Sequence, residues 1–322
     1  MARYLITGIA GFIGSNIAEY LINAGEKVTG LDNFSTGKKE TVTYLNNLPN
    51  HHNLDIIEGD IRDADICKTA CSKADFVLHQ AALGSVPRSM KYPLLYNDVN
   101  ITGTLNMLNA AKENDIKRFV FASSSSVYGD TPVLPKVETM PTNPKSPYAL
   151  SKLTGEHYCK LFNDVYNLNT IALRYFNVFG PRQDPESQYA AVIPKFITAL
   201  LKNESPTIYG DGSQTRDFTF ISNVIQANLA SCNASPEAFG NAFNIGCGGN
   251  TSINHLAQII KKETHSTSDI NYVDARDGDV KDSQADTEKS QRLLNLPPFE
   301  SLESGLKKTT NWYKNAVSTF KN

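Results

Sequence analysis

The sequence contains a tyrosine and a lysine, four positions apart, that could act together in a proton transfer. Tyr148 and Lys152 follow Pro147, at the start of a segment with the pattern of a helix. Side chains four positions apart share a helix face, so both should point into the same space. A phenol has a pKa of about 10 and is a weak base at neutral pH, but a neighbouring ammonium favours the phenolate. The pair is therefore a candidate general base for a substrate hydroxyl.

Four consecutive serines, Ser123 to Ser126, follow a predicted strand over residues 118–123. Open α/β sheets bind ligands at the carboxyl ends of their strands, where these hydroxyls could hydrogen-bond a reacting oxygen. We expect this role for Ser124 and Ser126, whereas an ordinary turn explains Ser123 and Ser125 better. A tyrosine and a lysine at this spacing are common in helices, and the serines favour a catalytic role over a surface one.

A glycine-rich turn, with Gly8, Gly11 and Gly14, lies between a predicted strand and a predicted helix. Glycines let backbone N–H groups approach a pyrophosphate, towards which the helix directs its positive end. Asp32 ends the second predicted strand and suits the hydroxyls of an adenosine ribose. Its carboxylate would repel a 2′-phosphate, so we expect NAD and not NADP. Asp60 and Ile61 could hold the adenine edge, although an ordinary strand-end turn explains them nearly as well.

Short β-rich segments alternate with helical ones through the first half of the chain. We predict strands over 4–7, 27–31, 55–58, 76–80, 118–123 and 170–175, and helices near 12–24, 99–114 and 147–166. This alternation predicts βαβ units and a parallel sheet covered on both faces. The expected fold class is therefore α/β, with a Rossmann-type doubly wound sheet.

The sequence pattern changes after residue 176. Segments 177–216 and 248–298 are richer in Gly, Pro, Asn and Asp, with an isolated strand over 207–209. We expect residues 1–176 to form an NAD-binding domain, to which residues 217–247 return with a strand over 242–245. Residues 177–216 and 248–322 would form a smaller, mixed α/β domain that binds the substrate.

Composition argues against several classes of protein. The 322 residues are 40% hydrophobic and 20% charged, with a net charge of −2, and show no basic face for nucleic acid. No segment approaches the ~18 apolar residues of a membrane helix, and the first predicted strand leaves no room for a signal peptide. The five scattered cysteines lack the partners of a zinc site. We expect a cytoplasmic protein with reduced thiols, without a metal, a nucleic-acid partner or a membrane partner.

Taken together, these motifs resemble the extended short-chain dehydrogenase/reductase superfamily along essentially the whole chain. The matching motifs are GxxGxxG at 8–14, HxAA at 79–82, NxxGT at 100–104, SPYxxSK at 146–152, RYFNVFGPR at 174–182, GDGxxxRDF at 210–218 and RxGD at 276–279. Within the superfamily the sequence is similar to nucleotide-sugar 4-epimerases. It most resembles bacterial enzymes acting on UDP-N-acetylhexosamines or their uronic acids, to which residues 84–89 and 183–185 point.

The resemblance implies an NAD-dependent 4-epimerase that interconverts UDP-sugars through a 4-keto intermediate. Tyr148 would be the base, Lys152 would also fix the nicotinamide ribose, and Ser124 or Ser126 would hold the sugar O4. The resemblance also implies that the NAD-binding residues include Phe12, Ile13, Asn33, Ala81, Ala82, Asn100 and Tyr175. The implied UDP-sugar set is Asn177, Val192, Tyr209, Arg216, Arg276 and Asp279, with Tyr209 over uracil. The resemblance also implies a homodimer, in which the helices near 99–114 and 147–166 form a four-helix bundle. It further implies a role in surface polysaccharide or O-antigen supply.

The identity of the sugar stays open among hexoses, N-acetylhexosamines and uronic acids. Ser283 resembles the position where glucose-restricted epimerases carry a bulky Tyr, so it would leave room for an N-acetyl group, with Gly84 and Ser85 lining the same pocket. Two alternative activities occur in the same fold. Dehydratases carry Asp-Glu where this chain has Ser125 and Ser126, and decarboxylases carry a Glu at the second of these two positions. A non-catalytic NAD-binding module is a third alternative, which the intact Tyr, Lys and Ser positions disfavour.

Overall fold

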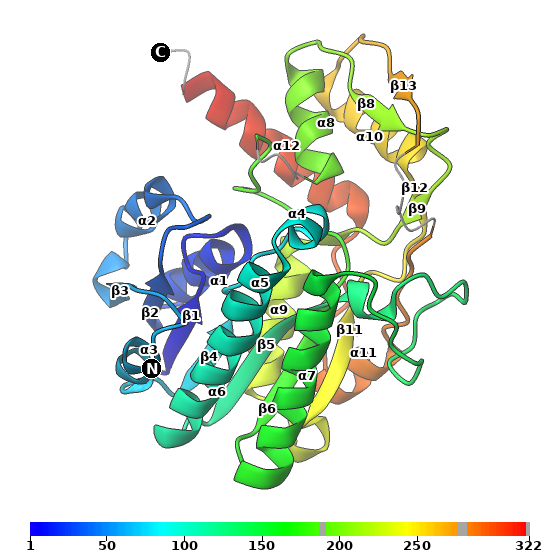
Figure 1. Ribbon diagram of the computed structural model, residues 1–322. Coiled ribbons are helices and arrows are strands. Elements are labelled where there is room, and N and C mark those ends of the chain that lie inside the picture. Colours follow the sequence, from blue (N-terminus) through cyan, green and yellow to red (C-terminus); the bar gives the residue numbers. More distant parts are fainter. Residues whose placement is uncertain (187–190, 276–281, 320–322) are drawn as a thin grey trace.

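A seven-stranded parallel sheet forms the centre of the computed structural model, which describes residues 1–186, 191–275 and 282–319. The strand order is β11-β6-β5-β4-β1-β2-β3 (Figure 1). The strands are β1 (Arg3–Thr7), β2 (Lys27–Asp32), β3 (Leu54–Glu58), β4 (Phe76–His79), β5 (Arg118–Ser124), β6 (Thr170–Tyr175) and β11 (Asn241–Ile245). The chain runs outward from β1 to β3 and then, in the other direction, from β4 to β11. This confirms the predicted doubly wound α/β fold, in which ligands bind where the strand order reverses.

The strands of this sheet carry apolar side chains on both faces. Successive side chains of a strand point to opposite faces, so Leu5 packs into one core cluster while Tyr4 and Ile6 pack into the other. Phe121 and Val120 of β5 divide between the clusters in the same way. Near-continuous apolar strands are what a parallel sheet requires when helices cover both of its faces.

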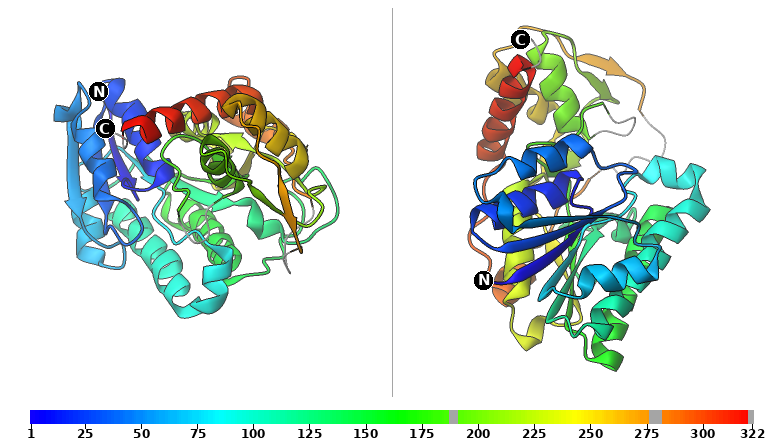
Figure 2. Two further views of the ribbon diagram at one scale, coloured as in Figure 1. Left: turned by 90° about the horizontal axis from the view of Figure 1, so that it is seen from above. Right: turned by 90° about the vertical axis from the view of Figure 1, so that its left-hand side faces the viewer.

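One layer of helices lies on each side of the sheet (Figures 1 and 2). One layer holds α3 (Ala64–Cys71), α6 (Gly103–Glu113) and α7 (Pro147–Tyr166), with the short helices α4 (Val86–Lys91) and α5 (Pro93–Asn97) against α7. The other layer holds α1 (Phe12–Asn23) and α9 (Ile221–Cys232), with α2 (Lys39–Asn46) beside α1. Helix α11 (Glu288–Leu294) contacts the edge strand β11.

A smaller group of elements lies beyond the carboxyl ends of the strands, at the top of Figure 1. It contains α8 (Val192–Leu201), α10 (Ile253–Thr264) and α12 (Leu302–Thr319), together with the parallel pair β8 (Thr207–Tyr209) and β13 (Asn271–Val273). Two further ladders pair β7 (Val178–Phe179) with β10 (Thr219–Phe220), and β9 (Thr215–Arg216) with β12 (Thr251–Ser252). The predicted division into two domains at residue 176 stays a prediction.

Most predicted elements lie within a residue or two of the observed ones, and α7, β6 and β8 have the predicted bounds. The helix predicted near 99–114 is different, because it divides into the π-helical turn η2 (Asp98–Thr102) and α6. Helix α3 was not predicted. Asp63 caps it by accepting hydrogen bonds from the N–H groups of Asp65 (3.0 Å) and Ile66 (3.2 Å), which stabilises a helix too short to show a clear period.

No helix in the described ranges is long and apolar enough to cross a lipid bilayer. The five cysteines are all free thiols, and burial is complete or nearly so for Cys67, Cys71, Cys159 and Cys232.

Candidate active site

The turn between β1 and α1 brings backbone atoms into unusually close contact. Gly8 has a φ of +72°, and a Cβ there would lie 2.9 Å from the backbone of Ala81. A Cβ on Gly14 would lie 2.2 Å from the carbonyl oxygen of Gly8. Only glycine fits either position. The N-cap of α1 is a third glycine, Gly11, so the helix begins directly at the turn without a side-chain cap. Uncapped N–H groups at the start of a helix suit the phosphates of a dinucleotide.

Asp32 ends β2 beside this turn and is 8% exposed. Its carboxylate accepts hydrogen bonds from the N–H groups of Ala10 (2.9 Å) and Phe34 (2.8 Å). Burial raises the pKa of Asp32, and these hydrogen bonds oppose the rise. A Cβ on Gly37 would lie 3.0 Å from the Asp32 carboxylate, so the segment between them closes tightly over it.

A cavity of about 90 Å³ adjoins Asp32. Eight of the predicted cofactor residues line it: Gly8, Gly11, Asp32, Asn33, Asp60, Ile61, Ala81 and Ala82. Neither Lys nor Arg occurs among the described residues that line it. A 2′-phosphate would thus face a carboxylate without a compensating cation, and the residues fit NAD better than NADP.

Asp60 is already engaged within the protein. Its carboxylate accepts hydrogen bonds from Arg62 (2.8 Å) and from the Asn33 side chain (2.7 Å). The Arg62 guanidinium holds the pKa of Asp60 well below its usual range. The carboxylate is therefore ionised at neutral pH, and the pair fixes Asn33 at the edge of the cavity.

Two other predicted cofactor residues use their polar atoms to support the cavity wall. The buried amide of Asn100 bonds both backbone groups of Leu83 (2.9 and 3.1 Å) and the Ser151 hydroxyl (3.0 Å). The hydroxyl of Tyr175 bonds Gln80 (3.2 Å) and Asn228 (2.9 Å). These bonds hold the segment 80–83 that lines the cavity. Contact of Asn100, Tyr175 and the α1 residues Phe12 and Ile13 with the cofactor stays a prediction.

Helix α7 positions Tyr148 and Lys152 near its first turn. Ser146 caps this helix by accepting a hydrogen bond from the Ala149 N–H (3.1 Å). Lys152 is 5% exposed, and its ammonium donates to the Ala122 carbonyl (2.7 Å). Burial lowers the pKa of Lys152 to about 8.

Burial raises the pKa of Tyr148, and the Ser124 side chain, which lies near the Tyr148 hydroxyl, opposes the rise. The sequence led us to expect that Lys152 would lower the pKa of Tyr148, but burial determines the direction of the shift, and the Lys152 ammonium donates to the Ala122 carbonyl.

The serines that follow β5 take different roles. Ser124 accepts hydrogen bonds from the backbone N–H (3.2 Å) and the hydroxyl (2.9 Å) of Ser126, at the start of the 3₁₀ turn η3 (Ser125–Tyr128). The hydroxyls of Tyr148, Ser124 and Ser126 thus lie together, and a hydrogen bond links the two serines. Ser123 instead donates to the Glu156 carboxylate (2.5 Å), away from this set. Contact of Ser124 or Ser126 with a substrate oxygen stays a prediction.

A buried ion pair behind these hydroxyls was not predicted. Glu156 of α7 pairs with Arg174 of β6 (2.7 Å), and both side chains are less than 10% exposed. Arg174 also donates to the Tyr128 hydroxyl (2.8 Å), which donates to Asn244 of β11 (2.7 Å). The sequence does show an acidic residue, Glu156, in the predicted helix 147–166 and a basic residue, Arg174, in the predicted strand 170–175, and this was the signal that could have indicated the pair.

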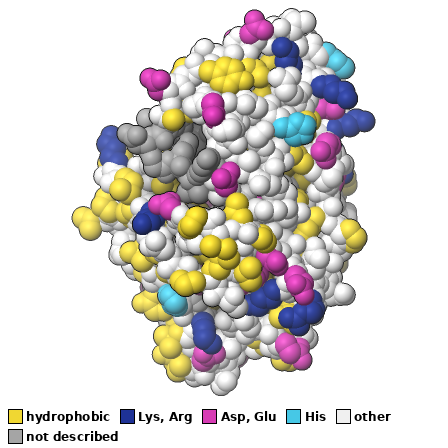
Figure 3. All heavy atoms as spheres, turned by 90° about the vertical axis from the view of Figure 1, so that its right-hand side faces the viewer, with side chains coloured by type: hydrophobic (Ala, Val, Ile, Leu, Met, Phe, Trp, Pro, Cys, Tyr) yellow, Lys and Arg dark blue, Asp and Glu magenta, His cyan; other side chains and the backbone are white. Residues whose placement is uncertain are grey.

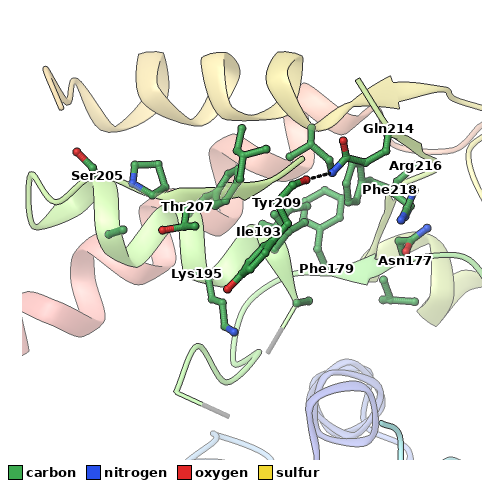
Figure 4. A pocket seen from close by; sticks show the side chains of 18 residues that line it. Asn177, Phe179, Ile193, Lys195, Ser205, Thr207, Tyr209, Gln214, Arg216 and Phe218 are labelled. Carbon is green, nitrogen blue, oxygen red and sulfur yellow. Dashed lines mark hydrogen bonds between the residues drawn. The ribbon is translucent and has the colours of Figure 1, made fainter. Parts of the chain in front are cut away.

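A second cavity, of about 510 Å³, lies among α8, β8 and β9 (Figure 4). Four predicted substrate residues line it: Asn177, Val192, Tyr209 and Arg216. Figure 4 shows Tyr209 near its centre, with Asn177 and Arg216 together at one end. Gln214 donates to the Tyr209 carbonyl (2.8 Å), the dashed bond of Figure 4.

The charge of this second cavity is positive. Its charged lining residues, among those described, are Lys195 and Arg216. Sequence reasoning missed Lys195, because a single lysine on a helix resembles any surface lysine. A cavity with two cations and an aromatic ring suits an anion attached to a flat ring system.

The predicted sugar-selecting residues lie outside both cavities. The Ser283 N–H donates to the carbonyl of Thr215 (3.2 Å). Ser283 therefore lies beside β9, against the residue that precedes Arg216. Ser85 caps α4 by accepting a hydrogen bond from the Arg88 N–H (3.1 Å), and a Cβ on Gly84 would meet open space. Arg276 and Asp279 lie outside the described residues.

Known proteins of similar sequence share this arrangement of elements. The model of the NAD dependent epimerase/dehydratase family matches residues 4–246. The UDP-glucose 4-epimerase of Mycolicibacterium smegmatis is 36% identical over 315 residues, 97% of this chain and 99% of that protein.

Two solved structures are similar over nearly the whole chain. The UDP-N-acetylglucosamine 4-epimerase of Methanobrevibacter ruminantium, in complex with UDP-N-acetylmuramic acid, has a TM-score of 0.92 and 44% identity, covering 98% of this chain and 99% of that one. The UDP-glucose 4-epimerase of Thermus thermophilus, in complex with NAD, has a TM-score of 0.87 and 32% identity, covering 98% and 100%. The chain therefore belongs to the NAD dependent epimerase/dehydratase family, and its cofactor is NAD.

Proposed function

We propose that this enzyme is an isomerase, an NAD-dependent 4-epimerase of UDP-sugars that interconverts UDP-N-acetylglucosamine and UDP-N-acetylgalactosamine. The observation that carries the proposal is the set of three hydroxyls of Tyr148, Ser124 and Ser126, which lie together near the buried ammonium of Lys152. The glycine turn and the basic cavity give this set a cofactor on one side and a nucleotide on the other. Relatives that are UDP-sugar 4-epimerases support the same conclusion.

Bound NAD supplies a reversible oxidation at C4 of the sugar, which yields a 4-keto sugar and then its epimer. Tyr148 removes the proton of the C4 hydroxyl and returns it after the sugar has turned over. Burial makes the phenolate unfavourable and Ser124 opposes this effect, so the charge of the nearby Lys152 ammonium would have to add to the stabilisation. Ser124 or Ser126 holds the C4 oxygen by a hydrogen bond.

The basic cavity anchors the part of the substrate that does not react. Arg216 and Lys195 would bind the diphosphate and polar atoms of the nucleotide, and Tyr209 would stack on uracil. This anchoring lets the sugar rotate while the nucleotide stays bound. The reaction has no net redox change, so it should proceed without added reductant.

The enzymatic alternatives need acidic groups where this sequence has Ser125 and Ser126. A 4,6-dehydratase must also remove a proton from C5 and protonate a leaving hydroxyl, which requires an acid and a base. Ser125 and Ser126 occupy those positions in the sequence. A non-catalytic NAD-binding module would need neither a tyrosine hydroxyl placed near Ser124 nor the buried Lys152 on the same helix as that tyrosine.

The preference for an N-acetylated sugar rests on Ser283. It lies beside Thr215 and Arg216, near the end of the cavity that would hold the diphosphate. A small side chain there leaves room for a group at C2, and the corresponding uronic acids would fit the same space. The amino-sugar product would supply surface polysaccharide synthesis, including O-antigen.

A homodimer is the second part of this proposal. Helix α7 exposes a row of apolar side chains, Leu150 (52%), Leu161 (46%) and Val165 (57%), and neighbouring α5 exposes Leu94 (84%). Hydrophobic side chains gather along the left edge of Figure 3, the side on which these helices lie. Two copies could cover these rows by packing α6 and α7 into a four-helix bundle.

Tyr148→Phe tests the proposed base. Removal of the hydroxyl should lower kcat for UDP-N-acetylglucosamine by about 10²- to 10⁴-fold, the usual range for general acid–base catalysis. The change is measured by separating the two epimers by chromatography. Ser125→Ala serves as the control and should retain most of the activity. Turnover by Tyr148→Phe close to that of the wild type would exclude this base.

Ser283→Tyr tests the sugar preference. The larger ring should lower kcat/KM for UDP-N-acetylglucosamine at least about tenfold more than for UDP-glucose, because a buried misfit costs a few kcal/mol. Parallel assays with UDP-glucose, UDP-glucuronate and UDP-N-acetylglucosaminuronate complete the panel, with Ser283→Ala as the control. Equal losses on both sugars would mean that Ser283 does not select at C2.

Leu161→Lys with Val165→Lys tests the dimer. Two charges in the apolar row should convert a dimer of about twice 35.4 kDa into a monomer, as measured by light scattering coupled to size-exclusion chromatography. Val133→Lys is a matched control, since Val133 is 55% exposed on a different segment. A wild-type protein that elutes as a monomer, or a double variant that stays dimeric, would contradict the bundle.

A further inference from the structure

The segment Pro181–Asp184 follows β7 and contacts α1, the helix that follows the glycine turn. The carbonyl of Pro181 accepts a hydrogen bond from the Asn16 side chain of α1 (3.1 Å). Arg182 donates to the Ser15 hydroxyl (3.2 Å) and forms an ion pair with Glu19 (2.5 Å), both also on α1. These contacts reach from residue 182 to the first turns of α1, more than 160 positions earlier in the sequence.

Arg182 is held on several sides. Its side chain is 10% exposed, and its backbone φ of +66° lies in the left-handed region that non-glycine residues seldom adopt. The guanidinium carbon lies 4.9 Å from the ring centroid of Tyr44 on α2, and the Tyr44 hydroxyl donates to Glu19 (2.5 Å). Arg182 therefore joins α1 to α2 across the outer side of the cofactor turn.

Asp184 fastens the loop between β2 and α2. Its carboxylate pairs with the Lys38 ammonium (3.1 Å), and the Lys38 N–H donates to the Ala10 carbonyl in the glycine turn (3.2 Å). Ser35, Thr36 and Gly37, which immediately precede Lys38, line the cavity beside Asp32. The loop is thus restrained by the glycine turn on one side and by Asp184 on the other.

We propose that Pro181–Asp184 is a strap that retains the bound NAD between turnovers. NAD returns to its starting state after each cycle of an epimerase, so its release would serve no purpose. The loop 33–37 closes over Asp32, and the cofactor leaves only if this loop moves away from α1. Arg182 and Asp184 oppose that movement as positioning residues, through α1 and Lys38 and without touching the cofactor. The inference rests on the NAD site and not on the identity of the sugar.

The test measures how fast NAD dissociates. Holoenzyme carrying isotopically labelled NAD is diluted into excess unlabelled NAD, and the label that stays bound is counted after rapid gel filtration. Asp184→Asn should accelerate the loss about two- to fivefold, because its ion pair is partly exposed. Lys38→Met should give the same acceleration, and the double variant should give no more. Arg182→Met should accelerate the loss at least about tenfold, since this ion pair is largely buried.

A matched control separates the strap from a general effect of removing an ion pair. The pair Lys68–Glu113 joins α3 to α6 at 3.2 Å with side-chain exposures of 63% and 38%, against 54% and 35% for Lys38–Asp184. Glu113→Gln should leave the dissociation rate within experimental error of the wild type. Circular dichroism and thermal unfolding verify that each variant is folded. Folded Asp184→Asn and Lys38→Met proteins that release NAD at the wild-type rate, or equal acceleration by Glu113→Gln, would overturn the strap.

Discussion

The buried ion pair between Glu156 and Arg174 holds together the elements that carry the proposed catalytic groups. Through Ser123, Tyr128 and Asn244 it joins β5, α7, β6 and β11 behind the hydroxyls of Tyr148, Ser124 and Ser126. Removing one partner of such a pair generally costs about 3–5 kcal/mol, because the other charge is left buried and unpaired. Together with the hydrogen bond from Lys152 to Ala122, the network ties α7 to β5, which carry Tyr148 and Ser124.

The parallel sheet places the reacting groups between the two cavities. All seven strands point their carboxyl ends to the same edge, so the glycine turn after β1, the serines after β5 and Asn177 after β6 gather there. The basic cavity of α8 and β8 faces that edge and offers binding energy away from the reacting carbon. Such remote binding can hold a substrate whose sugar must detach, turn over and bind again. The proposed function therefore combines firm binding of the nucleotide with loose contact to the sugar.

Local patterns in the sequence predicted much of the fold and site. Strand periodicity, the glycine turn with Asp32, and the helix that carries Tyr148 and Lys152 depend on neighbours in the chain, and the structure has these elements where the sequence predicts them. Features that depend on distant partners were missed. Arg182 meets Glu19, and Asn100 turns towards Leu83 through a π-helical turn, because tertiary packing brings them together. The pKa of Tyr148 was expected to fall, but burial, which the sequence does not reveal, raises it.

The most direct test of the central claim is the fate of the hydrogen at C4. UDP-N-acetylglucosamine carrying deuterium at C4 is incubated with the purified enzyme in ordinary water, and the epimer is examined by NMR and mass spectrometry. Oxidation and reduction at C4 by the same bound cofactor predict that the product keeps its deuterium at C4 and that no reductant is needed. Loss of the deuterium to water during epimerisation would contradict the account.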